Sequence, residues 1–90
     1  MKPNWNEILT GIQLSKIVTA TTRETEIVLK LEGVGTHLFG GAYIILYYAA
    51  REDLPFVVMS RIPGSEKTIV FRHLENAVNY INELLVPYTL

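Results

Sequence analysis

Residues 42–50 read AYIILYYAA, nine apolar side chains in succession that follow Gly40-Gly41 and precede Arg51-Glu52-Asp53. A strand with one face in water alternates apolar and polar residues, whereas this stretch offers apolar side chains to both faces of a sheet. Because a chain of 90 residues has little material with which to cover both faces, we expect part of the cover to come from a second copy of the chain or from a partner.

The rest of the chain predicts two helices and four further strands. One helix is expected over residues 4–11, where Asn4 and Glu7 match a capping box, and another over 74–85, where apolar residues recur on one stripe. Segments rich in β-branched residues, or with alternating apolar and polar residues, predict strands over 17–22, 27–32, 56–62 and 67–72. The short connections favour an antiparallel meander. The expected fold is therefore a small α+β protein, a single domain over residues 1–90, with an antiparallel sheet of about four to five strands and the C-terminal helix packed on one face.

Parity along the central strand gives two candidate surfaces. Tyr43, Ile45 and Tyr47 share one face, and Ala42, Ile44, Leu46 and Tyr48 share the other. Whichever set points away from the C-terminal helix is expected to form an apolar and aromatic surface, unless the short N-terminal helix covers it. The residues that we expect to bind a partner or a second copy are Tyr43, Ile45, Tyr47, Tyr48, Met59 and Arg61.

Residues 33–41 contain four of the six glycines and predict a loop. The segment begins like a dinucleotide-binding turn, but Leu38 stands where the third glycine would be and no helical pattern follows. We expect a mobile or adaptable loop in which Phe39 packs under the C-terminal helix or into a neighbouring subunit. The residues assigned to this flexible or docking loop are Gly35, His37, Phe39 and Gly40.

Catalytic and metal-binding patterns are weak. Ser60, Ser65, His73 and Asp53 can be assembled on paper into a hydrolytic triad, but almost any chain supplies such a set and no strained nucleophile turn is present. His37 and His73 have no companions at metal-ligand spacing, and the chain contains no cysteine. We expect no catalytic residue, no metal site and no cofactor, and therefore a protein that is not an enzyme.

The net charge of −1, with no run of one sign, does not indicate a nucleic-acid scaffold. Arg61, Lys67 and Arg72 nevertheless lie on or beside the last two predicted strands, near Phe71. Cations and aromatic rings on a sheet are typical of surfaces that bind single-stranded nucleic acid, which gives a first alternative function. A small-ligand-binding domain is the second alternative.

Excess apolar surface without catalytic groups favours a non-enzymatic protein-binding module that acts as a homodimer. A small adaptor, regulatory subunit or inhibitor, of the kind that mobile genetic elements often encode, fits this description, and the sequence does not identify its protein partner. Residues 1–7 lack the apolar core of a signal peptide, and the longest apolar run is about half of what a membrane helix needs. We therefore expect a cytoplasmic protein without a membrane segment.

Overall fold

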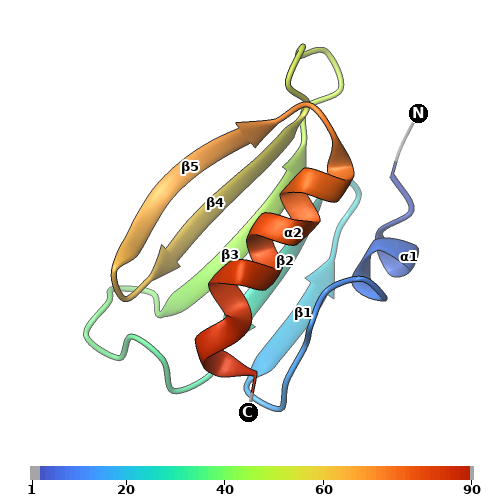
Figure 1. Cartoon of the computed structure of the whole chain (residues 1–90). Coiled ribbons are helices and arrows are strands. Elements are labelled where there is room, and N and C mark those ends of the chain that lie inside the picture. The colour runs from blue at the N-terminus through green and yellow to red at the C-terminus, as the bar shows by residue number, and fades with distance from the viewer. Residues whose placement is uncertain (1–2, 90) are drawn as a thin grey trace.

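The structure, a computed structural model, describes residues 3–89 and contains a five-stranded antiparallel sheet crossed by one long helix (Figure 1). The expected α+β fold is confirmed. No helix within residues 3–89 is long and apolar enough to span a membrane. The elements follow one another as α1 (Trp5–Leu9), β1 (Val18–Thr22), β2 (Glu26–Leu31), β3 (Ala42–Tyr48), β4 (Phe56–Ile62), β5 (Ser65–Phe71), α2 (Leu74–Leu85) and the 3-10 turn η1 (Val86–Tyr88).

Helix α1 begins where the capping pattern predicts. The Asn4 Oδ1 accepts a hydrogen bond from the Glu7 amide at 3.3 Å, which satisfies one of the free amides of the first turn. A helix of five residues makes too few internal hydrogen bonds to be stable alone, so it depends on packing. Trp5 supplies that packing, because its ring is buried and its Nε1 donates to the carbonyl of Glu24 at 3.0 Å.

The sheet is a meander in the order β1-β2-β3-β4-β5, as expected from the short connections. Strands β4 and β5 are joined by the two residues Pro63 and Gly64, and Gly64 has a φ of 81°, which glycine adopts without a steric cost. Because this turn is shorter than the expected connection over residues 62–66, β5 begins at Ser65, two residues before the predicted start. The central strand β3 ends at Tyr48 and not at residue 50.

Helix α2 covers one face of the sheet. Its apolar stripe, Ala77, Ile81 and Leu85, is fully buried. We call the strand face beneath it the covered face. The apolar residues of this face that are almost completely buried are Ile27, Leu29, Leu31, Ala42, Ile44, Leu46 and Val58.

Helix α1 lies on the same side of the sheet as α2. Asn82 of α2 joins the two, because its Nδ2 donates to the Gly11 carbonyl and its Oδ1 accepts from the Gln13 amide, both at 2.9 Å. Trp5 of α1 also belongs to the same buried cluster as the α2 stripe. The N-terminal helix therefore does not cover the second face of the sheet, and within residues 3–89 no other helix does so (Figure 1).

The glycine-rich connection 33–41 folds as two successive turns. The Leu38 amide donates to the Gly35 carbonyl at 2.8 Å, and the Gly41 amide donates to the Leu38 carbonyl at 3.0 Å. Gly35 has a φ of 61°, and a β-carbon there would lie 2.8 Å from Leu38 Cδ1. A larger residue at position 35 would therefore be strained and would push Leu38 out of its place against the core.

Candidate functional site: the open face of the sheet

The face of the sheet opposite the helices is defined by strand register, and we call it the open face. Three rungs of directly paired residues cross it. The Lys30 rung contains Thr19, Lys30, Tyr43, Arg61 and Glu66. The Ile45 rung contains Thr21, Val28, Ile45, Met59 and Thr68, and the Tyr47 rung contains Glu26, Tyr47, Val57 and Val70.

The centre of the open face is apolar and accessible to solvent. Tyr47 and Met59 are each 37% exposed, and Val70 is 46% exposed. Beside the Tyr47 rung, the loop between β3 and β4 adds Leu54, which is also exposed. These four residues are most of the large exposed apolar side chains in the described part of the chain, and a contiguous patch of this kind is typical of an interaction surface.

Charged side chains lie at the two ends of the face. Lys30 and Arg61 lie on the Lys30 rung, where the Arg61 Nε is 3.5 Å from an oxygen of the Glu66 carboxylate. The opposite end has Glu26 on the Tyr47 rung and a pocket of about 340 Å³ lined by Glu52, Asp53, Leu54, Val57 and Val70, which we call the acidic pocket. Lys30 and Glu26 therefore lie toward opposite ends of the same strand, β2.

Five of the six residues expected to bind a partner lie together on the open face: Tyr43, Ile45, Tyr47, Met59 and Arg61. Tyr48 does not. It follows Tyr47 in the strand, so its side chain points to the covered face, where its ring centroid is 5.4 Å from that of Phe56. Val28 and Val70 also lie on this surface and were not among the expected residues, because the strand register that places them beside Ile45 and Val57 is set by the tertiary structure.

The loop residues Gly35, His37, Phe39 and Gly40 lie between β2 and β3. Phe39 is 90% exposed, so the expectation that it packs under the C-terminal helix is wrong; its neighbour Leu38 packs against the hydrophobic core instead. A β-carbon at Gly40 would lie 3.8 Å from Arg61 Nη1, which places the loop at the Lys30 end of the open face. Insertion of Phe39 into a neighbouring subunit remains a prediction.

The three cations expected to contact nucleic acid do not gather on one surface. Arg61 is on the open face, Lys67 alternates to the covered side, and Arg72 follows the end of β5. The nearby Phe71 stacks on Tyr80 of α2, with ring centroids 5.5 Å apart. A stacking platform flanked by these cations is therefore not assembled by the sheet.

The residues of the hypothetical triad are far apart. Ser60 is buried, and its Oγ lies 3.3 Å from the Ser65 Oγ. Both serines lie near the turn that joins β4 to β5. His73 follows the opposite end of β5, so the length of a strand of seven residues, about 20 Å, separates it from Ser65. Within residues 3–89 no three His, Asp or Glu side chains come together as a metal site would require.

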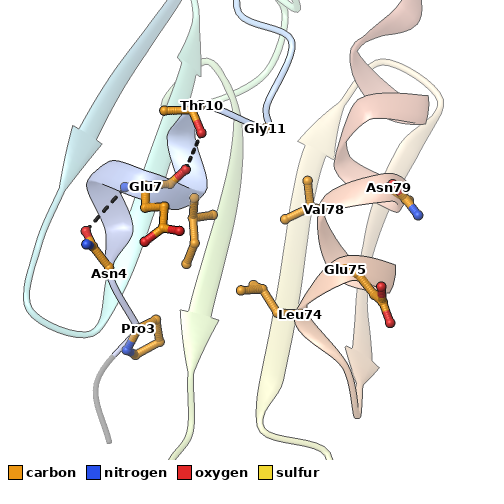
Figure 2. A pocket seen from close by; sticks show the side chains of 10 residues that line it. Pro3, Asn4, Glu7, Thr10, Gly11, Leu74, Glu75, Val78 and Asn79 are labelled. Carbon is orange, nitrogen blue, oxygen red and sulfur yellow. Dashed lines mark hydrogen bonds between the residues drawn. The ribbon is translucent and has the colours of Figure 1, made fainter.

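A second concave site lies between α1 and α2 (Figure 2). This groove has a volume of about 590 Å³ and is lined by Pro3, Asn4, Glu7, Ile8, Thr10, Gly11, Leu74, Glu75, Val78 and Asn79. Leu74 and Val78 point toward α1, whereas Glu75 and Asn79 point away from it. Ligand sites usually add a few convergent polar groups to an apolar lining, and α2 offers none here.

Two of the three polar side chains on the α1 side of the groove, those of Asn4 and Thr10, already bond to the backbone of their own helix, and the third is the Glu7 carboxylate. The Asn4 Oδ1 accepts from the Glu7 amide, and the Thr10 Oγ1 donates to the Glu7 carbonyl at 2.6 Å (Figure 2). The groove is therefore an apolar seam between two helices with little to orient a small molecule.

Comparison with known proteins found no protein family that matches the chain, no similar curated protein and no similar solved structure.

Proposed function

We propose that this protein is a non-enzymatic protein-binding module and that the open face of its sheet is the binding surface. The observation that carries this proposal is the cluster of Tyr47, Met59 and Val70, which lies uncovered on a regular sheet while the chain's helices pack on the other side. Exposed aromatic and methionine side chains are enriched where proteins bind one another.

The shape and size of the face also favour a protein over a small ligand. Five strands about 4.8 Å apart and about 20 Å long give a face of roughly 500 Å². The acidic pocket lies at one end of this face, whereas the exposed apolar residues spread over its centre, as in protein interfaces, which bury several hundred Å² on each partner.

The charges of the open face favour a protein over a nucleic acid. Lys30 and Arg61 are matched in number by Glu26 and Glu66, so the face has no excess of positive charge. Binding to phosphate chains depends on such an excess. An adaptor, a regulatory subunit or an inhibitor would each act by covering part of its partner's surface with the open face.

The test is affinity capture from the native host with immobilised wild-type protein, Met59→Glu and Val86→Glu. The introduced carboxylate disrupts an apolar interface at Met59, and Val86 is a matched control because it is a large exposed apolar residue in η1, away from the open face. We expect the wild type and Val86→Glu to retain the same protein, including untagged copies of this chain, and Met59→Glu to lose it.

Two results would contradict the proposal. Retention of a metabolite without any protein would favour the small-ligand alternative. Binding of a fluorescent single-stranded DNA at low salt, about 50 mM, with loss of binding as salt increases, would favour the nucleic-acid alternative, since phosphate contacts release counterions.

A further inference from the structure

We propose that the open face binds a second copy of this chain, face to face, about a two-fold axis that runs across the strands through the Ile45 rung. The inference rests on the proposed function and names its partner. In this arrangement each strand faces its own counterpart in reversed direction, so the Lys30 rung of one copy lies over the Tyr47 rung of the other.

Charge complementarity within β2 supports this orientation. Lys30 and Glu26 lie four residues apart on that strand, on the same face and on either side of the middle rung. The two-fold axis therefore brings Lys30 of each copy over Glu26 of the other. Packed sheets are about 10 Å apart, a distance that a lysine and a glutamate side chain together can bridge.

The acidic pocket faces the Arg61–Glu66 ion pair of the other copy, which has no net charge, so the orientation is decided by Lys30 and Glu26. The same axis places Arg61 of one copy over Val57 of the other, because both lie on β4 at equal distance from Met59. Val57 lines the acidic pocket together with Glu52 and Asp53. Arg23 and Arg51 lie in the turns at that end, but neither belongs to a strand or lines the pocket.

The other two-fold arrangement is disfavoured by charge. An axis parallel to the strands would place β2 of one copy over β4 of the other at the same rung, and Lys30 would then face Arg61. Like charges brought together in an interface cost affinity. Of these two arrangements, the axis across the strands alone places Lys30 opposite a carboxylate.

The apolar contact and the area are sufficient for a dimer. Across the axis Val28, Ile45 and Met59 each meet their own counterparts, so the middle rungs form an apolar layer. Two faces of roughly 500 Å² bury about 1,000 Å² in total, the lower limit for a specific interface. We therefore expect a dimer that dissociates at micromolar concentration and not a permanent one.

The first test is sedimentation equilibrium of the wild type, Lys30→Glu, Glu26→Lys and the double variant from submicromolar to high micromolar concentration. Each single change brings like charges together twice in the symmetric dimer, and we expect the dissociation constant of the dimer to rise about tenfold or more. The double variant restores opposite charges and is expected to return within about threefold of the wild type.

If the double variant loses as much dimer affinity as the two single variants lose together, the proposed orientation is wrong. If the wild-type chain is monomeric over the whole concentration range, a second copy is not the partner of the open face. In that case the proposed protein-binding role still stands if capture through Met59 recovers a different protein, and it fails if no protein is captured. The two proposals are thus refuted by different results.

Single-cysteine variants give a test that does not depend on charge. The chain has no cysteine, so each introduced thiol is unique, and Tyr47 and Met59 are equally exposed. With a short bismaleimide crosslinker, whose spacer bridges the roughly 10 Å between packed sheets that is too long for a direct disulfide, Met59→Cys should form a covalent dimer across the proposed axis, whereas Tyr47→Cys should remain mostly monomeric. Efficient crosslinking of the Tyr47→Cys variant, with little crosslinking of Met59→Cys, would indicate the axis parallel to the strands and would refute the proposal.

Discussion

The two faces of this sheet are built from the same five strands and are completed in different ways. On the covered face, Ile44 is fully buried beneath α2, while on the open face Tyr47 is 37% exposed. Both residues belong to β3, within one apolar run. The comparison shows that an apolar side chain in a strand contributes most to folding on the face that the chain itself covers, whereas on the other face its full burial depends on association.

The strongest test of this difference is to truncate adjacent isoleucines on the two faces. Ile44→Ala removes a fully buried side chain and should lower the free energy of unfolding by about 3 kcal/mol or more. Ile45→Ala removes a half-buried side chain from the open face and should cost about 1 kcal/mol when the chain is dilute. Urea unfolding at submicromolar concentration measures both values, and an equal loss at the two positions would contradict the assignment of the faces.

A weaker effect is expected where α1 joins α2. Asn82→Ala removes two hydrogen bonds, to Gly11 and Gln13, and should lower the free energy of unfolding by about 1–2 kcal/mol. Asn79→Ala is the matched control on the same helix, because its side chain is exposed and points away from the groove, and it should change stability by less than about 0.5 kcal/mol. Chemical unfolding of both variants measures the difference. Similar values for the two would mean that Asn82 does not hold the helices together.

A carboxylate on the open face should separate association from folding. Tyr47→Glu should leave the dilute chain folded, with a loss of under about 1 kcal/mol, because the exposed site keeps the new charge hydrated. The same change should prevent the dimer from forming at micromolar concentration. Circular dichroism with sedimentation distinguishes the two effects, and an unfolded variant would show that the open face is needed for the monomer fold.

The smallest effect on folding is expected at the loop tip. Phe39 is 90% exposed, so Phe39→Ala should change the free energy of unfolding by less than about 0.5 kcal/mol. Leu38→Ala, one residue earlier, should cost more because Leu38 packs against the core. If Phe39→Ala weakens the dimer measured by sedimentation, the ring docks onto the second copy; unchanged dimerisation would refute that role for the loop.

Local pattern was sufficient to predict most elements of this fold. The capping pair Asn4 and Glu7 marks the start of α1, and the apolar stripe that includes Ala77 and Ile81 marks α2. Hydrogen-bonding groups and helical periodicity act over a few residues, so they can be read without knowledge of the rest of the chain. The same holds for the antiparallel order, since short connections leave neighbouring strands little choice of partner.

The division into two faces could not be predicted, because residues 42–48 are apolar at every position and parity then carries no signal. Burial of Ile44 and exposure of Tyr47 depend on where α2 packs and on α1 joining it through Asn82, contacts between segments far apart in the sequence. For the same reason the residues expected to bind a partner included Tyr48, whose side chain points to the covered face. Phe39, expected under the C-terminal helix or in a neighbouring subunit, is exposed in the single chain. The sequence by itself determined which segments become strands and helices, and the tertiary structure decided which apolar side chains the chain covers and which it leaves for a partner.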